Sequence, residues 1–221
     1  MKVLVLDIGG SNVKMRMTGQ EERTKFSSGP AFTPQDLLAG LKEHAADWDY
    51  EAVTVGFPAP VLAGRLPREP KHLGGGWTDF DFEKELGKPV KLINDAAMQA
   101  VGSYEGGRTL FLSLGTGLGS ALISDYHVIA TELCELRWSK SSTIESQVAK
   151  AKKKHLGPKR WEERVHLIVE MLRKSLLPDS IVIGGGEAKH LKELPAGARR
   201  VDNDMALEGG EAVWNEPRFQ L

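Results

Sequence analysis

The chain has 221 residues, of which 41% are hydrophobic and 27% are charged, which suits a globular protein of one or two domains with a substantial core. Its formal net charge of −1 predicts no general attraction to nucleic acid or to an anionic membrane surface. The single cysteine, Cys134, excludes an intrachain disulfide and a cysteine-rich zinc site. The apolar start is too short for a signal peptide and no later segment could span a bilayer, so we expect a cytoplasmic protein without zinc.

The first half of the sequence predicts a strand–turn–strand unit followed by alternating helices and strands. Residues 2–8 are rich in Val, Leu and Ile and predict a buried strand, and the apolar alternation of 13–17 predicts a second strand after a glycine turn. The segment TPQD at 33–36 has the spacing of a capping box at the start of a helix. The pattern then predicts a buried strand at 52–57, a Pro/Gly-rich loop at 58–76, a short helix at 79–87, a strand at 89–95 and a helix at 95–107.

The second half repeats this order of elements. Residues 109–125, TLFLSLGTGLGSALISD, predict strand, glycine turn and strand, and residues 180–191 predict a buried strand that runs into a glycine-rich helix start. The basic run at 149–160 is interpreted as a solvated face or loop. A long helix before the last strand has an apolar stripe made of Trp161, Val165, Ile168, Leu172 and Leu176.

This repetition predicts two similar α/β lobes. The boundary is expected near Gly106-Gly107, which divides the chain into an N-terminal lobe of residues 1–106 and a C-terminal lobe of residues 107–221. A final helix at about 206–214 is expected to pack back across the lobes.

The two glycine turns between strands are potential phosphate sites. A glycine turn leaves main-chain N–H groups without ladder partners and lets an anion approach them closely. The first turn offers Gly9, Gly10, Ser11 and Asn12 with the charge of Lys14, and the second offers Gly115, Thr116, Gly117 and Gly119. An acid beside such a turn, Asp7, makes sense if it organises Mg²⁺ between itself and the phosphates. Each turn alone is equally compatible with a plain β-hairpin. The two turns together, with the segment IVIGGG after a third buried strand, favour a cleft for a nucleotide or polyphosphate.

A further polar pair, Asn94-Asp95, stands where a predicted strand ends and a helix begins. Asp95 could serve only as the N-cap of that helix. Strand ends that face a cleft are also where α/β proteins place their chemistry, and an aspartate there could accept the proton of an attacking alcohol.

These segments together resemble the ROK family of sugar kinases, in the actin, Hsp70 and hexokinase-like superfamily, and within that family most closely the polyphosphate/ATP glucokinases. The resemblance depends on the order and spacing of six segments: DIGGSNVK, VGFPAPV, NDAAMQA, LSLGTGLGSALI, TELCEL and PDSIVIGGG.

The resemblance implies two actin-like, ribonuclease H-like lobes that close on a hexose and a phosphoryl donor. Glucose is the expected hexose, and ATP or polyphosphate is the expected donor. The resemblance also implies Asp95 as the general base, Asn94 and Glu132 as sugar ligands, and Asp7 as the Mg²⁺ residue. Gly75 and Gly76 would belong to the sugar-side loop, and the glycines of both turns would line the phosphates. Gly184, Gly185 and Gly186 would approach an adenosine if ATP is the donor.

The sequence departs from the family pattern on the acceptor side. The family has Glu, any residue, Gly and His where this chain has TELCEL, so Cys134 replaces the glycine and Glu135 replaces the histidine that helps to hold the sugar. Glu135 is therefore a candidate sugar ligand, with a surface acid as the alternative. The zinc-binding cysteine cluster of many ROK proteins is missing, as it is in the polyphosphate glucokinases.

The sequence is also compatible with other functions. The chain could be a non-catalytic relative that binds nucleotide or sugar, or a kinase for a different acceptor. The choice between ATP and polyphosphate is open, and a homodimer is expected only by family analogy. Basic residues that could attract polyphosphate are Lys140, Lys150, Lys152, Lys153, Lys154 and Arg160.

Overall fold

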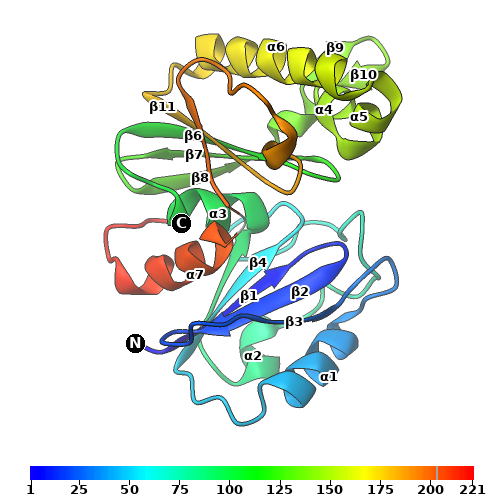
Figure 1. Cartoon of the computed structure of the whole chain (residues 1–221). Helices are drawn as coiled ribbons and strands as arrows, with labels where there is room; N and C mark the ends of the chain where they lie inside the picture. The colour runs from blue at the N-terminus through cyan, green and yellow to red at the C-terminus, as the bar shows by residue number, and fades with distance from the viewer. Residues whose placement is uncertain (203) are drawn as a thin grey trace.

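The computed structural model describes residues 1–202 and 204–221, arranged as two α/β lobes (Figure 1). The first lobe contains β1 (Val3–Ile8), β2 (Asn12–Met17), β3 (Thr24–Ser27), α1 (Pro34–His44), β4 (Ala52–Phe57), α2 (Phe82–Leu86), β5 (Val90–Asn94) and α3 (Asp95–Gly102). The second part contains β6 (Arg108–Leu114), β7 (Leu118–Ser124), β8 (His127–Thr131), η1 (Leu133–Glu135), β9 (Arg137–Ser139), β10 (Ser142–Thr143), α4 (Glu145–Val148), α5 (Lys150–Leu156), α6 (Pro158–Leu176), β11 (Ser180–Gly184), η2 (Ala188–His190), β12 (Ala198–Arg200) and α7 (Met205–Asn215).

The two main sheets of the described residues have the same topology. The first has the strand order β3-β2-β1-β4-β5 and the second the order β12-β11-β6-β7-β8, which is the same order read from the other edge. In both, the central strand pairs antiparallel with its hairpin partner and parallel with the strand that returns after a crossover. This duplicated five-stranded sheet is the ribonuclease H-like lobe of actin-like proteins, so the predicted fold class is confirmed.

Local sequence signals explain where several elements begin and what they bury. Thr33 and Asp36 form the reciprocal capping box predicted at the start of α1, with Pro34 in its first turn. The apolar stripe of α6 faces the second sheet, where Trp161 is fully buried and donates its indole N–H to the carbonyl of Val148 at 2.7 Å. Each lobe therefore has its own hydrophobic core.

A third core joins the two sheets through α3 and α7. These helices lie between the two sheets in Figure 1, and their apolar residues pack with those of β1, β6, β7 and β11. The helices cross closely because Gly102 and Gly209 have no side chain, and a Cβ at either position would overlap the backbone of the other helix. Thr54 in β4 anchors α7 further, since its hydroxyl donates to the carbonyl of Gly210 at 2.6 Å.

The predicted final helix is present as α7, and it packs on β1 and β4 of the first lobe as well as on α3. The residues that join α3 to β6 include the predicted boundary at Gly106-Gly107, and the division into two domains stays a prediction. None of the helices formed by the described residues has the length and apolar character needed to cross a membrane.

Candidate active site between the two lobes

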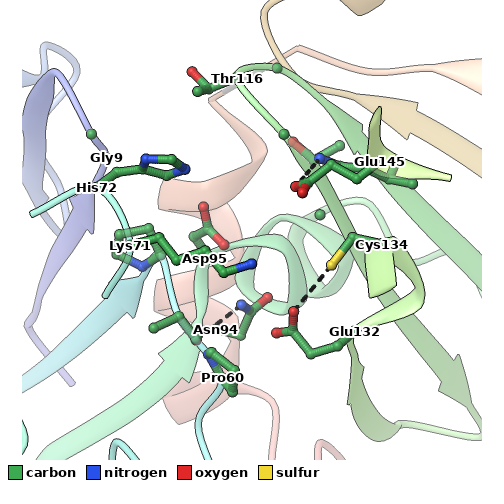
Figure 2. A pocket seen from close by; sticks show the side chains of 18 of the residues that line it. Gly9, Pro60, Lys71, His72, Asn94, Asp95, Thr116, Glu132, Cys134 and Glu145 are labelled. Carbon is green, nitrogen blue, oxygen red and sulfur yellow. Dashed lines mark hydrogen bonds between the residues drawn. The ribbon is translucent and has the colours of Figure 1, made fainter. Parts of the chain in front are cut away.

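A cleft of about 410 Å³ lies between the lobes and brings both glycine turns together. From the first lobe it is lined by Gly9, Gly10 and Ser11, and from the second by the turn at 115–119. Asn94 and Asp95 lie between them, at the carboxyl end of β5 (Figure 2). The structure therefore places together three segments that are far apart in the sequence.

The two polar residues at the junction of β5 and α3 have different roles. Asn94 is the N-cap of α3, and its Oδ1 accepts hydrogen bonds from the N–H groups of Ala96 and Ala97 at 3.0 and 3.1 Å. Its Nδ2 donates to the carbonyl of Ala59 at 3.2 Å, which ties the strand end to the loop after β4. Because Asn94 caps the helix, the alternative in which Asp95 is the N-cap is wrong.

The carboxyl group of Asp95 lies in the cleft in an environment that favours its neutral form. Burial, then the charge of Asp7, and more weakly that of Glu132, raise the pKa of Asp95 to about 7, although the N–H of Ala96 donates to its Oδ1 at 2.8 Å and works in the opposite direction. A carboxyl with a pKa near neutrality can accept a proton far more readily than an ordinary aspartate.

Asp7 and Lys14 form an ion pair behind the first turn. They lie opposite one another on β1 and β2, with Lys14 Nζ 2.9 Å from Asp7 Oδ2. Neither is among the residues that line the cleft, yet Asp7 is close enough to raise the pKa of Asp95. The described residues contain no group of three His, Cys, Asp or Glu side chains that could enclose a metal by themselves.

An acid from helix α4, which the sequence did not reveal, contacts the second glycine turn. Glu145, the first residue of α4, lines the cleft, and its Oε1 accepts from the N–H of Leu118 at 3.2 Å (Figure 2). Gly117 makes this possible, because a Cβ at that position would overlap the Glu145 carboxylate. Nothing in the local sequence distinguishes Glu145 from an ordinary acid in a first helical turn.

The acceptor side of the cleft contains Glu132 and Cys134. The thiol of Cys134 donates to Glu132 Oε2 at 3.3 Å, and burial, followed by Glu132, raises the pKa of the thiol to about 12. The thiol therefore remains protonated and serves as a hydrogen-bond donor. Glu135 does not line the cleft; its Oε1 instead lies 2.9 Å from Lys71 Nζ.

The remaining predicted residues lie outside the cleft. Gly75 and Gly76 belong to a loop held by Glu69, which lines the cleft and accepts from the N–H groups of Gly76, Trp77 and Thr78. Asn12 also lies outside the lining, on β2 next to the first turn. Lining residues that the sequence analysis did not single out include Pro30, Pro58, Pro60, Arg68, Lys71, His72 and Ser113.

The third glycine segment makes contacts inside the second lobe. A Cβ on Gly184 would lie 2.8 Å from the ring of Phe111, and one on Gly185 would overlap the backbone of Leu114. Both glycines thus allow β11 to pack closely against β6, and neither is among the residues that line the cleft. Their predicted approach to an adenosine stays a prediction.

Two ribonuclease H-like lobes, with a glycine turn from each and an aspartate between them, define the class of actin-like proteins that includes the sugar kinases. No family model matches the chain. It is 25% identical over 203 residues to a polyphosphate glucokinase of Mycobacterium tuberculosis (strain CDC 1551 / Oshkosh), an alignment that covers 82% of this chain and 76% of the relative. A polyphosphate glucokinase of Mycobacterium leprae (strain TN) is also 25% identical, over 82% of this chain and 62% of its own length.

Solved structures share the whole fold. An inorganic polyphosphate/ATP-glucomannokinase from Arthrobacter sp. strain KM superposes with a TM-score of 0.78 at 22% identity, covering 97% of this chain and 99% of that one. A ROK family glucokinase from Streptomyces griseus, in complex with glucose and AMPPNP, gives a TM-score of 0.76 at 15% identity, with coverage of 96% and 99%. The resemblance to ROK-family sugar kinases and to polyphosphate/ATP glucokinases is therefore confirmed.

Proposed function

We propose that this protein is a sugar kinase that transfers a phosphoryl group from ATP or polyphosphate to a hydroxyl of a hexose, with glucose as the first acceptor to test. The observation that supports this most strongly is the position of Asp95, whose pKa is about 7, between two glycine turns in one cleft. The similarity to polyphosphate glucokinases and ROK sugar kinases supports sugar phosphorylation in particular.

In this reaction Asp95 accepts the proton of the sugar hydroxyl as its oxygen attacks the terminal phosphorus of the donor. The bond from that phosphorus to the bridging oxygen breaks, and the donor leaves one phosphate shorter. Phosphoryl transfer depends mainly on positioning and on stabilising charge, which main-chain N–H groups of the two turns would supply. The N–H groups of Gly9 and Gly115 are not among them, because they donate to carbonyls within their own turns. Asn94 holds Asp95 in place through the cap of α3, and Glu132 would accept hydrogen bonds from the sugar.

The residues near the first turn fit a magnesium ion. Mg²⁺ usually keeps several waters and binds through one or two carboxylates and the phosphates of the substrate, so a complete protein cage is not required. Asp7 is the residue that would hold it, since its carboxylate lies close enough to influence Asp95 and is paired with the single cation of Lys14. The ion would neutralise charge on the phosphates.

The placement of the basic run supports polyphosphate as a donor. Helix α5 begins at the second glycine turn, where the N–H of Lys150 donates to the carbonyl of Gly115 at 3.0 Å. A chain of phosphates leaving the turn could therefore run along side chains such as Lys150 and Lys152. Glu187 is buried and pairs with Lys153 and, at 3.9 Å, with Lys150; the Lys150 side chain is 56% exposed and that of Lys153 18%, so Lys153 is the less available of the two.

The donor is tested by measuring the KM for ATP and for polyphosphate in the wild type and in a Lys150→Ala/Lys152→Ala variant. We expect a larger increase of KM for polyphosphate than for ATP, and a steeper salt dependence for polyphosphate in the wild type. Arg173→Ala/Lys174→Ala, which removes two positive charges in the last turn of α6, is the matched control. Equal changes for both donors would contradict a role of α5 in binding polyphosphate.

A second candidate function is a non-catalytic sensor of sugar or nucleotide. The observation in its favour is the altered acceptor side, where the thiol of Cys134 donates to one oxygen of Glu132, and Glu135 is paired with Lys71 and does not line the cleft. A ROK family transcriptional regulator also shares the fold, with a TM-score of 0.71 at 14% identity over 98% of this chain and 78% of that one.

A panel of hexoses, N-acetylhexosamines and non-sugar alcohols, each tested with ATP and with polyphosphate, separates the two functions. Transfer to a hexose supports the kinase. Binding of nucleotide or sugar without transfer to any acceptor would support the sensor, and transfer only to a non-sugar alcohol would indicate a kinase for a different acceptor.

A further inference from the structure

An ion pair crosses the opening of the cleft from one lobe to the other. Lys71 belongs to the long loop between β4 and α2, and Glu135 belongs to η1 of the second lobe, with Nζ and Oε1 2.9 Å apart. The two side chains are 58% and 50% exposed, so the pair lies at the rim of the cleft. Figure 2 shows Lys71 on the opposite side of the cleft from Glu132 and Cys134.

The pair differs from the other ion pairs that join the two halves of the chain among the described residues. Arg16 and Arg23 bind acids at 208, 211 and 204, which are on α7 or directly before it, and Arg199 pairs with Glu105 near the connection between the lobes. None of these residues lines the cleft. Lys71 does, so among the described residues its ion pair is the one that joins the lobes at the cleft itself.

The charges around the pair favour its formation. Glu135, and more weakly Glu145, raise the pKa of the Lys71 ammonium, while Lys71 and Arg68 lower the pKa of Glu135. Both partners are consequently charged across the neutral pH range. Lys71 Nζ thus brings a positive charge from the first lobe to the acidic side of the cleft.

The Lys71–Glu135 ion pair is also linked to Glu132 through the main chain. The N–H of Glu135 donates to the carbonyl of Glu132 at 3.0 Å, so the two residues are joined by the main chain of the 3₁₀ turn η1. A force that holds Glu135 near Lys71 therefore fixes Glu132 and Cys134 against the cleft.

We propose that Lys71 and Glu135 are positioning residues that form a clasp, closing the two lobes over a bound acceptor and holding Glu132 in place against it. This inference rests on the proposed sugar kinase function for its acceptor, while the clasp itself is a contact between lobes that can be measured without turnover. The clasp contributes mainly to acceptor KM, because it acts on binding and release and lies away from Asp95.

The test uses the full chain with three variants: Glu135→Lys, Lys71→Glu and the double charge swap. Hydrogen exchange measured by mass spectrometry on the free protein reports opening of the clasp, in segments 68–72 and 132–136. We expect both segments to exchange about 2- to 5-fold faster in each single variant, because a partly exposed ion pair contributes only a small stabilisation. In the double charge swap, both exchange rates should return towards those of the wild type. Glu170→Lys, the same charge change within an exposed ion pair of α6, is the control and should leave both segments unchanged.

Kinetics with the acceptor identified by the panel give the second readout. We expect each single variant to raise acceptor KM by about 2- to 5-fold with a smaller change in kcat, and the swap to recover most of the loss. Faster exchange only in the segment that contains the substitution, or no recovery in the swap, would overturn the clasp. Failure of every variant and of the wild type to phosphorylate any acceptor would overturn the proposed function instead, and the exchange data would still decide the clasp.

Discussion

Asn94 and Asp95 are adjacent in sequence, but Asn94 caps α3 and binds the carbonyl of Ala59, whereas Asp95 is left with its carboxyl group in the cleft. The position of Asp95 is therefore set by its neighbour. A residue that both capped the helix and accepted the substrate proton would have to release one partner to bind the other.

This arrangement makes a prediction about Asn94→Ala. The variant should lose about 1–2 kcal/mol of unfolding free energy, because the N–H of Ala97 loses its acceptor, that of Ala96 keeps only Asp95, and the carbonyl of Ala59 loses its donor. Turnover should fall as well, since Asp95 is no longer held. Urea unfolding and kinase assays measure the two effects. Thr33→Ala removes the cap of α1 at a residue that does not line the cleft, and it should cost about 1 kcal/mol without loss of turnover. Equal losses of turnover in both variants would mean that the Asn94 cap does not position Asp95.

The raised pKa of Asp95 predicts opposite effects of pH on activity and on stability. Activity should increase with pH with an apparent pKa of about 7, since the base must be ionised. Between an ordinary aspartate pKa of 3.8 and about 7, the folded protein holds a proton that the unfolded chain has lost, so the contribution of Asp95 to stability should decrease as pH rises through this window.

Asp95→Asn should accordingly be more stable than the wild type at pH 8, by about 1–2 kcal/mol after allowance for screening by water in the cleft. Unfolding by urea at pH 5 and at pH 8 measures this, and the difference between the two proteins should be smaller at pH 5. A variant less stable than the wild type at pH 8 would mean that the carboxylate is stabilised in the native cleft.

Cys134 should be unreactive in the native protein. Burial and Glu132 keep its thiol protonated, with a pKa of about 12, and the thiolate is the reactive species. Alkylation by iodoacetamide at pH 7.5, followed by mass spectrometry, should be at least about 10-fold slower than for the urea-unfolded chain. Equal rates in the two states would show that the hydrogen bond to Glu132 does not persist in solution.

The crossing of α3 and α7 predicts that Gly209→Ala is destabilising by about 1–3 kcal/mol, because the added methyl group overlaps the backbone of α3. Thermal unfolding measures this effect. Gly75→Ala is the matched control, since its Cβ meets open space, and it should change stability by less than about 0.5 kcal/mol. Similar values for the two variants would mean that the helices separate easily at this point.

The parts of this structure that could be predicted from the sequence are those governed by neighbours along the chain. The capping box of α1, the apolar stripe of α6 and both glycine hairpins depend on residues a few positions apart, and all are present. Strand β12 and the β9–β10 hairpin were not predicted, because two or three residues are too few to show a period.

The site was predictable only where a residue lies in such a local signal. Asp95 and the glycine turns mark strand ends, whereas Glu145 and Lys71 enter the cleft through contacts between distant segments. The role of Glu135 as a sugar ligand could not be judged from sequence for the same reason, since its partner Lys71 lies 64 positions away.

The role of Asp95 as the base is tested by comparing the wild-type protein with Asp95→Asn in the transfer of labelled phosphate, from ATP and from polyphosphate, to the best hexose of the panel at pH 8. If Asp95 is the general base, kcat should fall by at least about 100-fold in Asp95→Asn, while the variant stays folded and still binds the donor. A folded Asp95→Asn protein that phosphorylates the hexose at the wild-type rate would contradict this role.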